Sequence, residues 1–370
     1  MFNLSKKDFR KLDYILLFSL VTIIIFGLFV LNSATNPLKT GIKSQIFATI
    51  LGFVVMGFIF TIDLEFLYKL KWFIYIALIG LLISPKLFGH GGEQWGANLW
   101  VKIGPIALQP SEIGKVLHIL FLALFIGENK NNVNKKAFII KFLILGFIPS
   151  AIIVIHPDIG TGMVYAFITI VMFFVSGISW KNIGILLAIA IVVIAISIPI
   201  VWANLDQYAK DRILDFGGEQ RNLATSTHQT DRGLIALGSG KLNGRGYMKG
   251  PYSQNRYIPE QHTDFIFPVL VEDFGFIGGS CAIGLYFIIF SRLIKIAKNA
   301  ESLYHTEIII GVFALLFVHV FENIGMTMEV MPVTGIPLPF FSNGGTFQLI
   351  NLALMGLCLS VSMQRKSLDF

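Results

Sequence analysis

Charged residues are scarce in this sequence. Lysine, arginine, aspartate and glutamate make up 14% of its 370 residues, whereas hydrophobic residues make up 55%, and the mean hydropathy is +0.73. Because a soluble domain carries about 25% charged residues, this chain has too little polar surface to cover a globule in water. The scarcity excludes an ordinary soluble enzyme and a nucleic-acid-binding domain, which needs an exposed basic face. The composition predicts an integral membrane protein.

Cysteine is almost absent as well. Cys281 and Cys358 both lie inside apolar runs, so the sequence has neither a disulfide framework nor the spacing of a cysteine metal site. His262 and Asp264 have a spacing that zinc ligands can have, but no further cluster of ligands accompanies them. A zinc site is therefore not expected.

Long apolar runs are what the sequence does contain. Runs of about 20 residues, the length that crosses a bilayer, occur about ten times. They span residues 14–32, 43–62, 71–88, 111–127, 137–156, 158–177, 182–202, 265–290, 307–328 and 344–363. The sequence predicts an all-α polytopic membrane protein with about ten transmembrane helices, folded as a single integral membrane domain over residues 1–370. The basic segment 1–11 precedes the first run without a small-residue cleavage pattern, which favours a retained signal anchor.

Lysine and arginine set the expected orientation, because they gather in short cytoplasmic loops. With the N-terminus inside, most bases of the short loops fall on the inner side. The short outer segments hold only Lys39, Lys43, Lys86, Lys102 and Lys115. The predicted topology is N-in and C-in, with residues 203–264 forming one large extracellular loop between helices 7 and 8. Residues 89–110 and 329–343 are expected to be interfacial or re-entrant segments.

An acid stands where this loop meets the eighth apolar run. In "IPEQHTDFIFPVL", Thr263 can cap the following helix, Asp264 would lie in its first turn, and Pro268 fits only near a helix start. One interpretation is a carboxylate that stabilises the helix dipole. The other is a carboxylate at the outer membrane surface that accepts a proton or holds a divalent cation.

Other ionisable residues in the apolar runs leave similar alternatives. Glu112 and Lys115 in "QPSEIGK" are i,i+3 neighbours that either neutralise each other or face a phosphate. Glu272 and Asp273 lie deeper than Asp264 and favour a structural hydrogen-bond network over a role in a site. Asp158 in "HPDIGTG" is expected to cap the sixth helix.

A polar face on the ninth run combines His319, Glu322, Asn323 and Met326 at helical spacing. Because ionisable groups inside a membrane face protein or a cavity, this face is expected to point into the bundle. Its role is either packing or the lining of a cavity.

The loop segment between Asp231 and Glu260 contains no acid. Its bases are Arg232, Lys241, Arg245, Lys249 and Arg256, and six glycines alternate with them. Glycines let backbone N–H groups approach an anion while bases neutralise it. The segment is either a flexible solvated loop or a cradle for a pyrophosphate.

Six motifs, in their order along the chain, resemble the SEDS family of bacterial cell-envelope proteins (shape, elongation, division and sporulation). They are "QPSEIGK" at 109–115, "HPDIGTG" at 156–162, "GSGKLNGRG" at 238–246, "IPEQHTDFIF" at 258–267, "ENIGM" at 322–326 and "PVTGIPLPFFSNGG" at 332–345. The resemblance is stronger to the elongation members than to the division members. The sequence departs from the family pattern at His156, Glu329 and Arg232, among other positions.

The resemblance implies a ten-helix enzyme that polymerises lipid II, a polyprenyl-diphosphate-linked disaccharide-peptide, into glycan strands. It implies a bacterial cytoplasmic (inner) membrane location, an active site on the outer face, and a class B penicillin-binding protein transpeptidase as partner. Besides lipid II and that transpeptidase, membrane lipid is an expected partner and nucleic acid is not. The essential acid of the family falls on Asp264, as general base or as ligand of a divalent cation (Mg or Mn).

The expected substrate-binding residues combine the family motifs with the basic loop. They are Glu112, Lys115, Lys241, Arg245, Lys249, His262, Thr263 and Asn323. Two other functions stay open: a lipid II flippase, which would use carboxylates near the membrane midplane such as Glu272 and Glu322, and a non-catalytic scaffold for the cross-linking partner.

Overall fold

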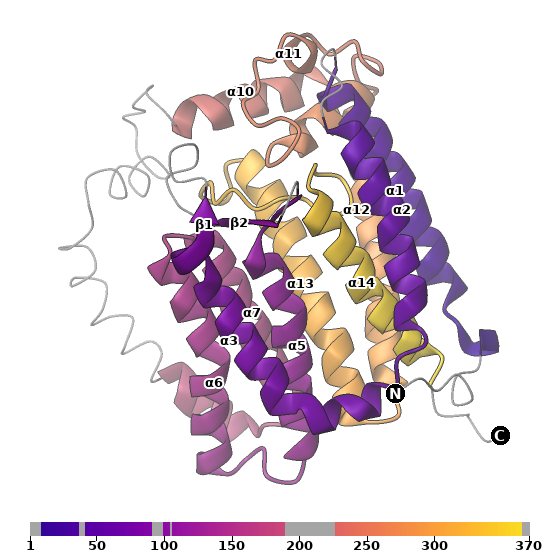
Figure 1. Cartoon of the computed structure of the whole chain (residues 1–370). Helices are drawn as coiled ribbons and strands as arrows, with labels where there is room; N and C mark the ends of the chain where they lie inside the picture. Colours follow the sequence, from indigo (N-terminus) through magenta and orange to yellow (C-terminus); the bar gives the residue numbers. More distant parts are fainter. Residues whose placement is uncertain (1–8, 37–40, 91–98, 104–105, 189–225, 365–370) are drawn as a thin grey trace.

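The computed structural model describes residues 9–36, 41–90, 99–103, 106–188 and 226–364 (Figure 1). Its long helices are α1 (Tyr14–Ala34), α2 (Ile42–Ile59), α3 (Lys71–Phe88), α5 (Pro110–Glu128), α6 (Lys136–Ile155), α7 (Ile159–Val175), α12 (Ile266–Lys298), α13 (Leu303–Thr327) and α14 (Gly345–Ser362). Shorter elements are η1 (Phe9–Lys11), η2 (Leu64–Leu70), α10 (Ser226–Ser239), α11 (Pro251–Gln254), β1 (Gly89–His90), β2 (Trp100–Ile103) and β3 (Ile106–Leu108).

The described part of the chain has 8 helices long and apolar enough to cross a membrane, counting η2 and α3 as one. Each matches a predicted run, which confirms the all-α polytopic class. The sixth predicted run forms α7, which has 17 residues, fewer than the other spans. The seventh run, 182–202, lies mostly outside the described residues, although residues 181–188 are helical.

Long helices pack side by side into one bundle (Figure 1), in which α14 contacts α2, and α13 contacts α5, α7 and α12. Helices α5, α13 and α14 are mostly buried by their neighbours, whereas only a minority of the residues of α2 and α3 is buried. The exposed faces carry large apolar side chains, among them Phe18, Phe73 and Phe287. In water such faces would favour aggregation, so they are suited to lipid.

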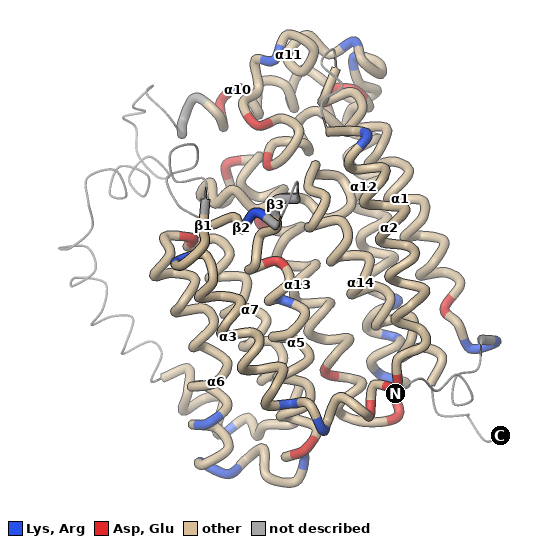
Figure 2. The backbone as a smooth tube through the Cα atoms, viewed as in Figure 1, with Lys and Arg blue, Asp and Glu red and all other residues tan. Residues whose placement is uncertain are grey.

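Charged residues gather toward the two ends of the bundle, with few between them (Figure 2). At the end that holds η1, Arg292 forms a bidentate pair with Asp13, and Lys71 pairs with Glu128. We call this the terminal end and the opposite one the loop end. Charged residues at the two ends and few between them are typical of a helix bundle that spans a membrane.

The loop end carries α10, α11 and a small antiparallel sheet of order β1-β2-β3 (Figure 1). Val101 pairs with Gly89 on one side and with Leu108 on the other. This sheet occupies part of the segment expected to be interfacial. Helix α10 packs against α12, so part of the predicted 203–264 loop is ordered helix, whereas residues 203–225 lie outside the described residues.

Candidate functional site

Asp264 lies at the loop end, two residues before the first residue of α12. The helix begins at Ile266 with Phe265 as its N-cap, so the expectation that Thr263 caps this helix is wrong. The Thr263 hydroxyl instead donates to the backbone and side-chain oxygens of Glu260. Pro268 does lie in the first turn, as expected. Because Asp264 precedes the cap, its side chain lies outside the first turn of the helix.

The Asp264 carboxyl has an altered pKa. Burial, and secondarily the negative charge of Glu260, raises its pKa from 3.8 to about 7. A carboxyl with a pKa near neutrality can both take and release a proton under physiological conditions. This property is the one that a general base or acid requires.

A segment without regular structure, residues 332–343, holds the Asp264 backbone in place, and we call it the proline strap. Asn323 on α13 donates from Nδ2 to the backbone oxygens of Asp264 and Ile336, each at 2.8 Å. The Ser342 hydroxyl donates to the backbone oxygen of Thr263 at 2.5 Å. The proline strap is therefore tied to the Asp264 segment at its middle, through Asn323, and near its C-terminal end, through Ser342.

Gly335 of the proline strap faces the Asp264 side chain. A Cβ at this position would lie 3.4 Å from Asp264 Oδ2, and the backbone has a φ of +75°, a conformation that favours glycine. The Tyr286 hydroxyl donates to the backbone oxygen of Pro339 further along the strap. A substitution at Gly335 would strain the backbone beside the carboxylate.

A buried network reaches the same strap from α5. Lys115 Nζ donates to Glu112 Oε1 at 2.7 Å and lies 3.1 Å from His319 Nε2, while His319 Nδ1 lies 3.1 Å from the backbone oxygen of Pro337. If protonated lysine donates to Nε2, Nδ1 carries the ring proton and donates to Pro337. The polar face of α13 thus points into the bundle, as predicted. The Lys115 network contacts the proline strap at Pro337, through His319, and Asp264 lies against the strap at Gly335, two residues earlier.

Most glycines of the basic loop pack against α12 or its N-cap. Gly240 and Gly244 have no room for a Cβ against the α12 backbone, and Gly275 in α12 has a non-helical φ of +69° where the loop approaches it. Lys241, Arg245 and Lys249 are exposed at their side chains. Packing therefore accounts for these glycines, while the bases are left available to an anion.

Glu272 and Asp158 have structural partners. The Glu272 carboxylate accepts from the backbone N–H groups of Tyr252 and Ser253, both at 2.8 Å, and so caps α11. Asp158 caps α7 by accepting from Thr161 N at 3.0 Å, as expected. These contacts favour the structural interpretation of both acids.

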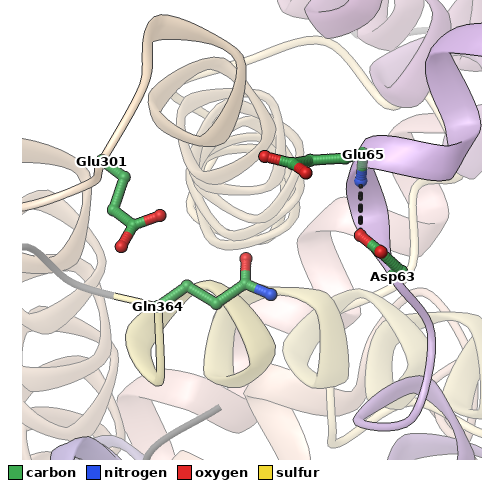
Figure 3. A pocket seen from close by; sticks show the side chains of 4 residues that line it. All are labelled: Asp63, Glu65, Glu301 and Gln364. Atoms are coloured by element: carbon green, nitrogen blue, oxygen red, sulfur yellow. Dashed lines mark hydrogen bonds between the residues drawn. The ribbon is translucent and has the colours of Figure 1, made fainter. Parts of the chain in front are cut away.

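The described residues form a cavity that lies away from Asp264. A cavity of about 260 Å³ lies at the terminal end, lined by Asp63, Glu65, Glu301 and Gln364 (Figure 3). It contains none of the predicted site residues. Within the described ranges, no group of three or more His, Cys, Asp or Glu residues could hold a metal ion.

Replacing Asn323 by leucine is expected to lower stability and activity together, because two buried carbonyls would lose their donor. An unsatisfied buried group costs about 1–3 kcal/mol, so the free energy of unfolding should fall by roughly 2 kcal/mol. Asn351→Leu on α14 is the matched control, since Asn351 is buried and its Nδ2 has no partner in the described chain. Equal thermal stabilities of the two variants in detergent would contradict this role of Asn323.

Sequence reasoning did not identify the proline strap as part of the site. His319 was placed on the correct face, but its contact with Lys115 joins residues 204 positions apart. Gly335 and Ser342 lie in the family motif "PVTGIPLPFFSNGG", but the motif does not show that they contact the Asp264 segment. The helical spacing of Asn323 with His319 and the family motifs pointed to these segments, but not to the contacts between them.

A family model for the FtsW, RodA and SpoVE cell cycle proteins matches residues 8–367. The chain belongs to this family. It is 32% identical to the peptidoglycan glycosyltransferase MrdB of Escherichia coli K12, over 99% of this chain and 98% of the relative. It is 26% identical to the peptidoglycan glycosyltransferase RodA of Treponema pallidum, over 95% and 98% of the two chains.

Solved structures agree with the family. A chain from a peptidoglycan synthase complex, studied for its coordination of polymerization and crosslinking, is similar with a TM-score of 0.81 and 28% identity, over 96% of this chain and 99% of that one. The rod shape determining protein RodA of Thermus thermophilus gives a TM-score of 0.70 at 25% identity, over 96% and 98%. The predicted membership in the SEDS family, and the stronger resemblance to its RodA members, are confirmed.

Proposed function

We propose that this protein is a peptidoglycan glycosyltransferase that polymerises lipid II into glycan strands during cell elongation. One observation carries the proposal: a carboxylate with a pKa of about 7 lies at the loop end, against a strap that a buried Glu112–Lys115–His319 network also holds. Relatives named peptidoglycan glycosyltransferase, matched over nearly the whole chain, support it.

In this proposal the reaction takes place where membrane and water meet. The sugar hydroxyl of the acceptor gives its proton to Asp264, and its oxygen forms a bond to the anomeric carbon of the donor. The bond from that carbon to the diphosphate breaks, and the diphosphate leaves with the electron pair. The exposed Lys241, Arg245 and Lys249 would neutralise the charge of the leaving group.

Lys115 acts indirectly in this scheme. It is 1% exposed, and its contacts are with Glu112 and His319. We assign to Glu112, Lys115 and Asn323 the positioning of the proline strap and Asp264. A divalent cation, if one is bound with the substrate, would screen the diphosphate charge, and no step above depends on it.

The proposed setting follows from orientation and from the relatives. With the termini in the cytoplasm, the loop end faces outward, so the active site would lie on the outer face of the bacterial cytoplasmic membrane. The likeness to a chain of a complex that couples polymerization and crosslinking supports a class B penicillin-binding protein as partner. Membrane lipid surrounds the apolar outer faces of the bundle.

The direct test is incubation of the purified protein with lipid II, alone and with the transpeptidase partner, followed by gel separation of glycan strands. Polymer is the expected product. In a parallel experiment, sealed vesicles report whether lipid II crosses the membrane. Crossing without polymer under any condition would instead establish a flippase.

Polymerisation is expected to rise with pH through about 7, because Asp264 must be ionised to accept a proton. One pH unit below the midpoint the rate should be about a tenth of the plateau. Glu260→Gln should move the midpoint to lower pH, since the Glu260 charge raises the pKa of Asp264.

The stability of the protein should also depend on pH through Asp264. The folded chain holds the proton of the Asp264 carboxyl more tightly than the unfolded chain, so the contribution of Asp264 to stability is present at low pH and is lost as pH rises through about 7.

Initial rates of polymerisation by the wild type and by Glu260→Gln, between pH 5 and 9, measure the expected pH dependence of the reaction. A flat profile, or a rate that falls as pH rises through 7, would contradict the role of Asp264 as base.

A further inference from the structure

A polar pocket of about 210 Å³ opens beside the Asp264 segment. Ala34 and Thr35 at the end of α1 form one wall, and residues between Arg256 and His262 form the other. His262 is two residues from Asp264, at most about 7 Å along an extended backbone. The proposed mechanism assigns no role to this pocket.

Gln261 lines this pocket and has a side-chain acceptor without a partner in the described chain. Its side chain is 5% exposed, and its Nε2 donates to the backbone oxygens of Ala34 at 2.7 Å and Ser253 at 3.0 Å. These two carbonyls fix the orientation of the amide, because the opposite orientation would place oxygen against oxygen. Oε1 is buried and finds no donor among the described residues. A buried acceptor without a donor is unfavourable, so a ligand N–H or O–H would be bound here.

The charged residues on the pocket walls restrict the chemical class of the ligand further. Arg256 is exposed, and the described chain supplies no carboxylate that pairs with it. Glu260, also exposed, adds a negative charge on the same pocket. A diphosphate carries no hydrogen-bond donor and would leave Gln261 Oε1 unpaired, and a polyprenyl chain would leave every polar group of the pocket unpaired. A group that combines N–H donors with a carboxylate satisfies both Gln261 and Arg256.

We propose that this pocket binds the peptide of the lipid-linked substrate, with a peptide carboxylate on Arg256 and a peptide N–H on Gln261 Oε1. The inference rests on the proposed function, since it names the part of that substrate that lies beside Asp264. The pocket thereby makes the enzyme selective for peptide-bearing disaccharides and aligns the sugar through its attached peptide.

The test compares two substrates, the lipid-linked disaccharide with its full peptide and the same disaccharide without it. For the wild type, KM should be lower with the peptide. Arg256→Gln should raise KM for the peptide-bearing substrate about tenfold, as expected for loss of a charged hydrogen bond, with kcat little changed and KM for the peptide-free substrate unaltered. Arg256→Lys should recover part of the loss. Lys130→Gln, which removes one exposed charge at the terminal end, is the control.

Equilibrium binding of both fluorescent substrates to the Asp264→Asn protein separates this inference from the proposed function. If the wild type forms no polymer, but binding to the Asp264→Asn protein depends on the peptide and is weakened by adding Arg256→Gln, the pocket assignment stands and the glycosyltransferase proposal falls. Polymer formation with equal affinity for both substrates would overturn the pocket assignment alone. An equal loss of affinity for both substrates in Arg256→Gln would place the contact on the sugar or diphosphate and would also overturn it.

Discussion

Asp264→Asn is expected to reduce glycan polymerisation by at least about 100-fold, the lower range for loss of a general base. The amide cannot accept the proton of the sugar hydroxyl, although it fills nearly the same volume. Since the backbone oxygen of Asp264, and not its carboxylate, bonds Asn323, the fold should be preserved. The measurement is the initial rate of strand formation, with thermal stability in detergent recorded for each variant.

Asp158→Asn is the matched control for this change. It makes the same substitution at the cap of α7, where asparagine caps as well as aspartate, and should leave the rate within about twofold. Asp264→Glu keeps the carboxylate but moves it by one methylene, so it should retain part of the activity. An Asp264→Asn protein that folds and polymerises normally would remove Asp264 from the mechanism.

Lys115→Met is expected to be the most destabilising substitution in the site. It would leave the Glu112 carboxylate buried without its cation, a loss of about 3–5 kcal/mol for a buried pair broken on one side. His319 would also lose its partner, and with it a constraint on the proline strap. Both the thermal midpoint and the polymerisation rate should fall.

A double variant decides how Lys115 acts. Glu112→Gln with Lys115→Met removes both charges, and replacing a buried pair by neutral groups is often tolerated. If Lys115 positions the strap, the double variant should regain most of the stability and part of the activity. Recovery of stability with no recovery of activity would mean that Lys115 contacts the substrate phosphate directly.

Hydropathy was sufficient to predict the helices because each span must satisfy its own backbone in the membrane. The predicted run 344–363 and the helix α14 (Gly345–Ser362) differ by one residue at each end. The start of α12 differs from the prediction, because Thr263, the expected cap, donates to Glu260 instead, a contact that the local sequence does not show. Local patterns therefore gave the spans more reliably than the helix starts.

The assembly around Asp264 could not be derived from spacing. Its contacts join residues far apart in the chain, as Asn323 to Asp264 and Ser342 to Thr263 do. The glycine-rich loop illustrates a different limit, since glycine serves the approach of a ligand and of a neighbouring backbone equally well. Only the position of Gly244 against α12 distinguishes the two uses.

The central claim is that the acid at the loop end performs glycosyl transfer on the outer face of the membrane. The most direct measurement uses sealed proteoliposomes in which the orientation of the protein is known and lipid II occupies both leaflets. A muramidase that cannot enter the vesicles then reports where the glycan strands lie. The account predicts strands only on the side of Asp264, and none with Asp264→Asn. Strands on the side of the termini, or lipid II that crosses without being polymerised, would contradict it.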